Sequence, residues 1–177
     1  LTENIKFIFG PPGTGKTTEI SKHVVNKISS GDSNKILILT PTNNAADVLA
    51  NRILSLSYED LYQESWLTRF GSTSDYDLLE RGIVSDKDSY VFSEKGNCVF
   101  ITTIHRFPYE IVNTLNDEII NISDIEWDTI IFDEASMIML PAIILPLFKR
   151  KYKQCIEDES KYTEFIIGGD PLQLPPI

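Results

Sequence analysis

The segment from Gly10 to Thr17 constrains this chain most, and it reads Gly-Pro-Pro-Gly-Thr-Gly-Lys-Thr. It matches the G-x-x-x-x-G-K-T phosphate loop and lies between an apolar stretch that predicts a strand and a stretch that predicts a helix. Glycines let backbone N–H groups turn inward around phosphate oxygens, and the helix N-terminus adds the positive end of its dipole. In this interpretation Lys16 reaches the β- and γ-phosphates, and Thr17 offers a hydroxyl to Mg²⁺. The alternative is a tight glycine turn with an exposed lysine, which the matching context disfavours.

The candidate nucleotide-binding residues are consecutive in the chain. They are Gly10, Pro11, Pro12, Gly13, Thr14, Gly15, Lys16, Thr17 and Thr18.

Apolar runs and helical patterns alternate along the chain, which predicts an α/β fold. Continuously apolar strands separated by helices are typical of a parallel sheet covered by helices on both faces. We expect strands at 5–9, 35–39, 99–102, 129–133 and 165–168, and helices at 16–29, 43–56, 103–115 and 137–149.

Residues 57–96 interrupt this alternation, and we interpret them as an insertion at the edge of the sheet. The segment has nine acidic and four basic residues, a net charge of −5. Its aromatic residues could stack on bases, but the negative charge opposes strand binding. A small local core formed by these aromatics is therefore the preferred interpretation.

A second motif is the apolar run from Thr129 to Phe132, which ends in Asp133 and Glu134. If this strand lies next to the phosphate loop, Asp133 would hold Mg²⁺, through water, and Glu134 would take a proton from an attacking water. Alone, such a pair is more often a solvated strand end. The phosphate loop upstream makes the functional interpretation the stronger one.

Charge and cysteine content exclude some classes. The net charge of −10 excludes a generally basic nucleic-acid coat, although a local groove remains compatible with it. Two distant cysteines, Cys98 and Cys155, indicate no disulfide framework or zinc site, so we expect a reducing cytoplasm. The longest uncharged apolar run, 137–148, is too short to span a bilayer, so no membrane partner is expected.

Three segments resemble motifs I, II and III of superfamily 1 helicases, most closely the RecD-like and Upf-like branches. They are 10–17, 133–136 and 169–176, and two weaker matches, 39–46 and 102–106, fall in the expected order as motif Ia and a single-strand contact motif. The resemblance implies a RecA-like P-loop NTPase fold that hydrolyses Mg-ATP and moves along single-stranded DNA or RNA, typically 5′ to 3′.

The resemblance also implies roles for particular residues. Gln173 would sense the γ-phosphate or orient the attacking water, since a carboxamide both donates and accepts. Contacts to the strand's sugar-phosphate backbone would come from Thr42, Asn43, Thr103 and His105. As alternatives, Thr42 caps the helix that begins near Asn43, or His105 is an ordinary half-buried histidine. The basic cluster at 149–153 is interpreted as a solvated helix end.

The chain departs from the family in two respects. Residues 1–177 contain no glutamine ahead of the phosphate loop, so selectivity for adenine is unsupported, and they do not include the second RecA-like domain whose arginines the family uses. We therefore expect residues 1–177 to be the first motor domain of a two-domain ATPase, weakly active at best in isolation. The alternatives are a non-motor ATPase switch that acts on a protein partner and an inactive nucleotide-binding scaffold. The complete set of catalytic residues argues against the scaffold.

Overall fold

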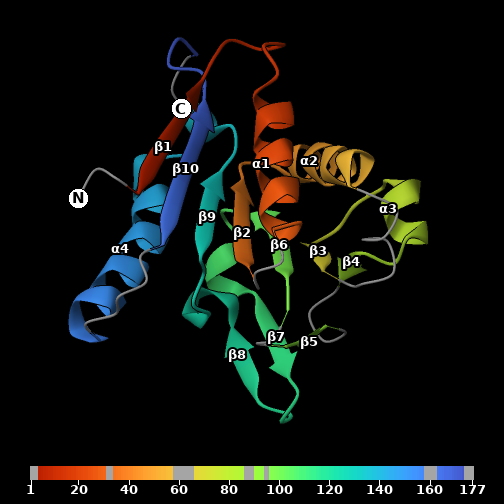
Figure 1. Cartoon of the computed structure of the whole chain (residues 1–177), viewed down its shortest axis with the longest axis vertical. Helices are drawn as coiled ribbons and strands as arrows, with labels where there is room; N and C mark the ends of the chain where they lie inside the picture. Colours follow the sequence, from red (N-terminus) through yellow and green to blue (C-terminus); the bar gives the residue numbers. More distant parts are fainter. Residues whose placement is uncertain are drawn as a thin grey trace.

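A parallel sheet of seven strands forms the centre of the part of the chain that the computed structural model describes (Figure 1). The structure describes residues 4–30, 34–57, 66–85, 90–93, 96–157 and 163–173, with the side chains of 149–157 left out. The strand order is β1-β10-β9-β2-β6-β3-β4. The strands are β1 (Ile5–Phe9), β2 (Lys35–Thr40), β3 (Leu67–Phe70), β4 (Val84–Ser85), β6 (Cys98–Thr103), β9 (Thr129–Phe132) and β10 (Glu164–Gly169).

The two faces of the sheet carry separate cores because neighbouring strand residues point to opposite sides. Ile36 and Ile38 of β2 pack under the helices α1 (Lys16–Ile28) and α2 (Asn43–Leu56). Leu37 and Leu39 face the other core, which includes Trp127 and is flanked by α4 (Leu140–Glu157). The predicted α/β fold with helices on both faces is therefore confirmed.

A small second sheet covers part of this other face. It contains β5 (Val91–Phe92), β7 (Ile111–Thr114) and β8 (Ile119–Asn121), with β7 and β8 antiparallel. Short 3₁₀ helices at Phe107–Tyr109, Ile122–Asp124 and Ala135–Met137 connect the elements. The helix expected at 103–115 is wrong. Pro108 limits the first part to one 3₁₀ turn, and the β-branched residues that follow form β7.

The segment 57–96 does lie toward one edge of the sheet, where it adds strands β3 and β4 and the short helix α3 (Tyr76–Glu80). The separate local core predicted for its aromatic residues is wrong for three of them. Trp66 packs in the core under α1 and α2, and Phe70 and Phe92 pack in the opposite core. The ring of Phe70 meets that of Phe100 edge to face, with centroids 4.8 Å apart. The described residues of this segment therefore contribute to both cores of the central sheet.

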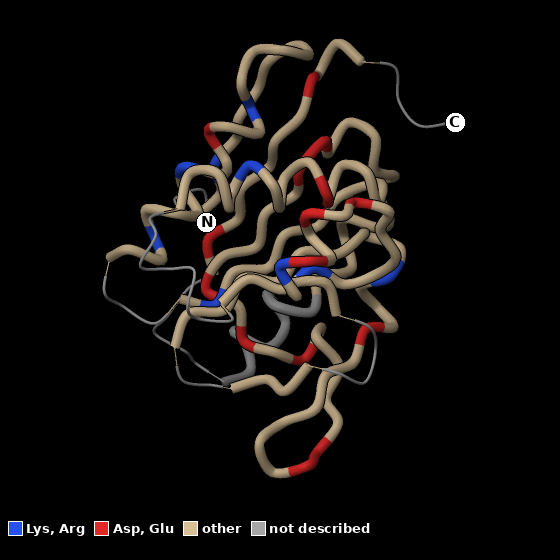
Figure 2. The backbone as a smooth tube through the Cα atoms, turned by 90° about the vertical axis from the view of Figure 1, so that its right-hand side faces the viewer, with Lys and Arg blue, Asp and Glu red and all other residues tan. Residues whose placement is uncertain are grey.

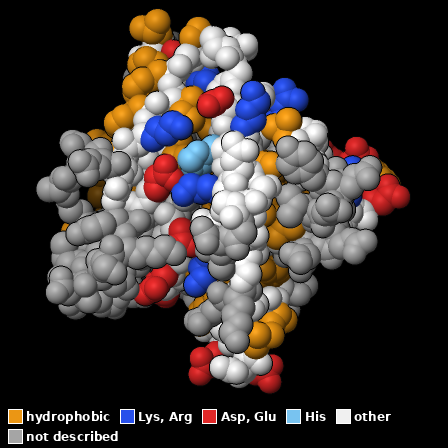
Figure 3. Space-filling view, in the orientation of Figure 1, with side chains coloured by type: hydrophobic (Ala, Val, Ile, Leu, Met, Phe, Trp, Pro, Cys, Tyr) orange, Lys and Arg blue, Asp and Glu red, His pale blue; other side chains and the backbone are white. Residues whose placement is uncertain are grey.

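One ion cluster ties α1 to the start of β10 on the face shown in Figure 3, where a histidine lies among acidic and basic side chains. Glu164 contacts Nζ of Lys27 at 2.8 Å and Nε2 of His23 at 3.3 Å. The hydrogen bond with His23, assisted by Lys27, lowers the pKa of Glu164 to about 2.

The lowered pKa of Glu164 predicts acid-sensitive stability. The stabilisation is present above the ordinary pKa of 4.5 and is lost as the pH falls toward about 2. Because the site is partly solvated, we expect Glu164→Gln to lower the free energy of unfolding at pH 7 by about 1 kcal/mol. Urea unfolding at pH 7 and pH 3 measures this effect. Glu19→Gln, at an exposed position of α1, should change neither value. An equal loss at both pH values would contradict the assignment.

Candidate nucleotide site

The phosphate loop has the backbone shape that its glycines predict. Gly13 and Gly15 have φ values of 82° and 90°, which side chains other than glycine rarely adopt. A Cβ atom on Gly10 would lie 2.3 Å from Oγ1 of Thr14, so the loop closes on itself only with glycine there. The loop connects β1 to α1, and no side chain caps the first turn of α1. The backbone N–H groups at the start of α1 are therefore free to bind an anion held in the phosphate loop.

The ammonium group of Lys16 lies over this loop. Its Nζ donates to the carbonyl oxygen of Gly10 at 2.7 Å and to that of Pro11 at 3.3 Å, and the residue is 6% exposed. Thr17 is half-buried in the first turn of α1, while the hydroxyl of Thr18 accepts a hydrogen bond from Nε of Arg52 at 3.2 Å. The two carbonyl contacts of Lys16 therefore hold its ammonium group at the loop, where it would contact a bound phosphate.

Asp133 and Glu134 follow strand β9. This strand is not a direct neighbour of β1, the strand of the phosphate loop, because β10 lies between β1 and β9. Two glycines at the end of β10 remove the side chains that would separate the sites. A Cβ atom on Gly168 would lie 2.8 Å from Cδ1 of Ile20 and 3.6 Å from Oδ1 of Asp133. The missing side chain brings Asp133 close to the start of α1. Gly169 was expected only as the first residue of the motif III match, and Gly168 had no predicted role, although two glycines ending an apolar strand signal close backbone approach.

Asp133 is 2% exposed, and burial raises its pKa to about 6, with a further contribution from Glu134. The backbone N–H of Glu134 donates to Oδ1 of Asp133 at 3.0 Å, and the charge of Lys16 acts in the opposite direction. A buried carboxylate that faces a lysine is an oxygen donor suited to Mg²⁺, as is the hydroxyl of Thr17.

The raised pKa of Asp133 implies that this carboxylate destabilises the folded chain. The folded state holds the proton up to about pH 6, whereas the unfolded chain releases it near 3.8, so the penalty is complete above pH 6. We expect Asp133→Asn to raise the free energy of unfolding at pH 7 by about 1–3 kcal/mol, while Mg-dependent nucleotide binding is lost. Thermal unfolding with and without Mg-ATP measures both effects, with exposed Asp77→Asn as the control. A less stable variant would contradict the prediction.

Glu134 combines an unusual backbone with an unsatisfied side chain. Its φ is 51°, one of two positive values among described residues other than glycine. Its Oε2 is buried and has no hydrogen-bond partner among the described residues. Backbone strain and an unpaired buried carboxylate oxygen are both typical of functional positions.

Gln173 is connected to the acidic strand end through Ser136, a link that the motifs do not predict. Oγ of Ser136 donates to Oε1 of Gln173 at 3.2 Å and accepts from the backbone N–H of Asp170 at 3.4 Å. Asp170 is 4% exposed and its Oδ1 accepts from the N–H of Leu172 at 3.0 Å. The loop after β10 is thereby held against the turn after β9. The proline pair at 175–176 lies outside the described residues.

The four candidate strand contacts come together at the carboxyl edge of β2 and β6, where Thr40 pairs with Thr103. Thr42 caps α2, because its Oγ1 accepts from the N–H of Ala45 at 3.2 Å, so the capping role considered for it is confirmed. Asn43 and His105 are exposed, so the half-buried interpretation of His105 is wrong. Thr103 is only 7% exposed, so its side chain offers little surface to a strand. The basic cluster at 149–153 lies in α4, where side chains are not described.

The loop, the buried lysine and the two acids define a P-loop nucleotide-binding domain on a parallel sheet. All of residues 1–177 match the family model described as an AAA domain. The chain belongs to this family, and its relatives are superfamily 1 helicases.

Relatives of this chain include DNA and RNA helicases. The chain is 34% identical over its full length to the RecBCD enzyme subunit RecD of Buchnera aphidicola from Acyrthosiphon pisum, covering 24% of that protein. It is 24% identical to the probable RNA helicase armi of Drosophila melanogaster, with 99% of this chain and 16% of that protein covered. It is 27% identical to the DNA replication ATP-dependent helicase/nuclease DNA2 of Saccharomyces cerevisiae, with 99% and 10% covered. The chain thus spans about a quarter or less of these relatives.

A solved structure shares the fold. The UvsW helicase from bacteriophage T4 superimposes with a TM-score of 0.53 at 12% identity, over 94% of this chain and 47% of that one. This supports the RecA-like architecture. No helix among the described residues is long and apolar enough to cross a membrane.

Proposed function

We propose that this domain binds and hydrolyses Mg-ATP to drive movement along single-stranded nucleic acid. The observation that carries the hydrolytic part is the buried Oε2 of Glu134, which has no hydrogen-bond partner among the described residues and follows directly after Asp133. A carboxylate oxygen without a partner is available to accept a proton. The strand-directed part rests on the family and on the edge where Asn43 and His105 are exposed.

Each residue has a separate task in the proposed reaction. Lys16 leaves the loop carbonyls and pairs with the β- and γ-phosphates. Thr17 and Asp133 would hold Mg²⁺, which would supply positive charge to the phosphates. Gln173 orients a water molecule toward the γ-phosphorus, and Glu134 takes its proton at Oε2. The oxygen–phosphorus bond forms as the bond to the β-phosphate oxygen breaks, giving ADP and inorganic phosphate.

Movement requires more than this domain. We propose that a second RecA-like domain of the same polypeptide supplies arginines that stabilise the transferring phosphoryl group. ATP binding would close the two domains and hydrolysis would reopen them, which steps the pair along the strand. Thr42, Asn43 and His105, which are exposed, would contact the sugar-phosphate backbone, whereas the nearly buried Thr103 would add little to this contact. DNA and RNA are both compatible with such contacts.

A second candidate is an ATPase switch that acts on a protein partner. The net charge of −10 favours it, and so does the acidic tip of the β7–β8 hairpin, formed by Asp117 and Glu118, which projects from the body in Figure 2. Such a surface repels nucleic-acid phosphates. We propose the cytoplasm as the location in either case, since Cys98 is buried and free.

ATP hydrolysis by the full-length protein, measured with and without single-stranded DNA and RNA oligonucleotides, separates the two candidates. A motor should be stimulated strongly, and the better oligonucleotide identifies its track. A hydrolysis rate that neither oligonucleotide changes would contradict the motor function and favour the switch that acts on a protein partner.

A further inference from the structure

Arg69 of β3 is a fully buried arginine outside the nucleotide site, and its side chain is 0% exposed. Its guanidinium group touches two turns of α2. Nε donates to Oδ1 of Asp47 at 2.9 Å, and one terminal nitrogen donates to the carbonyl oxygen and to Oδ1 of Asn43 at 3.2 and 3.1 Å. The other terminal nitrogen donates to the carbonyl oxygen of Phe70. One planar group therefore joins the end of β3 to the first turn of α2.

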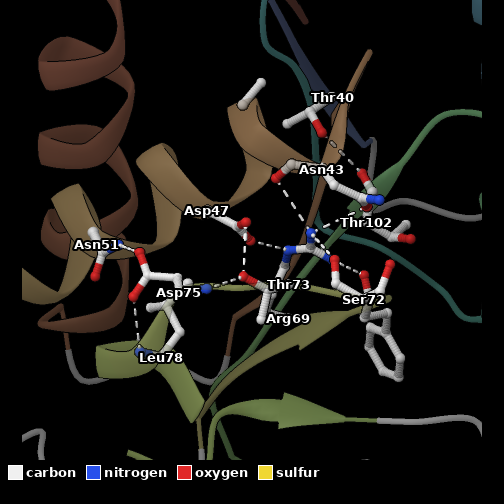
Figure 4. Close-up of polar contacts among 12 residues, drawn as sticks. Thr40, Asn43, Asp47, Asn51, Arg69, Ser72, Thr73, Asp75, Leu78 and Thr102 are labelled. Carbon is white, nitrogen blue, oxygen red and sulfur yellow. Dashed lines mark hydrogen bonds and ion pairs between the residues drawn. The ribbon is translucent and has the colours of Figure 1, made fainter.

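The partner of Arg69 is itself held by the segment that follows β3 (Figure 4). Oδ2 of Asp47 accepts from the hydroxyl of Thr73 at 2.8 Å. Oγ1 of Thr73 accepts from the N–H of Asp75, whose Oδ2 accepts from Nδ2 of Asn51 at 2.7 Å. Two successive turns of α2 are thus hydrogen-bonded to residues 69–75, which come from the segment we had interpreted as an insertion.

Arg69 cannot be a strand contact. It is enclosed by protein, and its charge is compensated by Asp47. Burial lowers its pKa, while Asp47 acts in the opposite direction.

The contact with Asn43 fixes the orientation of an exposed carboxamide. An arginine has only donors, so the oxygen of Asn43 must face it. The amide nitrogen of Asn43 is then left for another acceptor. Asn43 itself is exposed at the carboxyl edge of the sheet, beside the helix cap made by Thr42. A fixed N–H donor at the start of a helix suits a phosphate oxygen.

We infer that Arg69 is a positioning residue for strand binding, which turns the Asn43 carboxamide so that its Nδ2 donates to the backbone of the bound strand. The inference rests on the proposed function and gives residues 67–75 a role in it. A lysine at position 69 would keep the charge and the pair with Asp47. It has no planar fork to reach Asn43 and the Phe70 carbonyl together.

A double-mutant cycle tests this inference in the full-length protein. We would measure the affinity for fluorescent oligo-dT and oligo-U by anisotropy for wild type, Arg69→Lys, Asn43→Ala and the double variant. If Arg69 acts through Asn43, each single change should weaken binding by about tenfold, and the double variant should be no weaker than Asn43→Ala. Mg-ATP affinity should be unchanged in all four. Equal losses from Arg69→Lys in both backgrounds, or no loss, would overturn the inference.

A second variant tests the orientation without altering the buried arginine. Asn43→Asp keeps an oxygen toward Arg69 and replaces the outward nitrogen by a second oxygen, which repels phosphate. It should bind the strand more weakly than Asn43→Ala, and equal or tighter binding would overturn the inference even if Arg69→Lys fails to fold. Exposed Arg81→Lys, in the same segment, should bind as wild type. Wild-type protein that binds neither oligonucleotide would instead refute the proposed function.

Discussion

Replacement of Glu134 by glutamine is expected to slow ATP hydrolysis by the full-length protein by about 10²–10⁴-fold, the range typical for loss of a general base. Glutamine preserves the size of the side chain but cannot accept the proton at Oε2. The phosphate loop and Asp133 are untouched, so Mg-ATP affinity should remain close to wild type. Phosphate release and binding of a fluorescent ATP analogue measure the two quantities separately.

The matched control is Glu118→Gln, which removes an exposed carboxylate from the β7–β8 hairpin. It should hydrolyse ATP at the wild-type rate. Hydrolysis by Glu134→Gln within about tenfold of wild type would show that another group accepts the proton, since a general base contributes at least 10²-fold.

Replacement of Lys16 by methionine is expected to lower hydrolysis by about 10²–10³-fold, the effect of removing one preorganised charge or donor from a developing anion. Methionine fills similar space and has no positive charge. Unlike Glu134→Gln, this change should also weaken Mg-ATP binding, because Lys16 contacts phosphates before and during the reaction. Calorimetric titration with a non-hydrolysable ATP analogue measures the loss of affinity.

Exposed Lys22→Met in the same helix, α1, is the control for Lys16→Met. It should leave affinity and hydrolysis unchanged. Wild-type affinity in the Lys16 variant, with hydrolysis alone reduced, would mean that Lys16 meets the phosphates only in the transition state.

Local patterns predicted the elements that carry the nucleotide site. Strand β1 and helix α2 have the expected bounds, and α1, β2, β9 and β10 differ from expectation by one or two residues. The helices α1 and α2 and the strands β2, β9 and β10 are apolar on their buried sides, so the pattern and the tertiary structure agree there. The helix expected at 103–115 was wrong because its apolar spacing suits both a helix and short strands. Pro108 limits the first part to one 3₁₀ turn, and Val112 of β7 then packs in the core that includes Trp127.

The position of each strand could not be predicted, because strand order depends on long-range pairing. The functional interpretation of Asp133 and Glu134 assumed that their strand lies next to the phosphate loop, yet β10 lies between β1 and β9. Gly168 of β10 has no side chain between Asp133 and α1, so Asp133 still lies close to α1. Likewise, the acidic composition of 57–96 gave no indication that Arg69 would be buried against α2.

The sequence alone therefore determined the chemical groups and their local frames: a glycine loop that turns inward, a lysine at a helix start, and two acids after an apolar strand. These follow from backbone sterics and side-chain chemistry over a few residues. The tertiary structure decided which groups meet, including Ser136 with Gln173 and Arg69 with Asn43. Such contacts join residues distant in the chain, and they form only when the sheet aligns its carboxyl ends and burial makes each unpaired polar group costly.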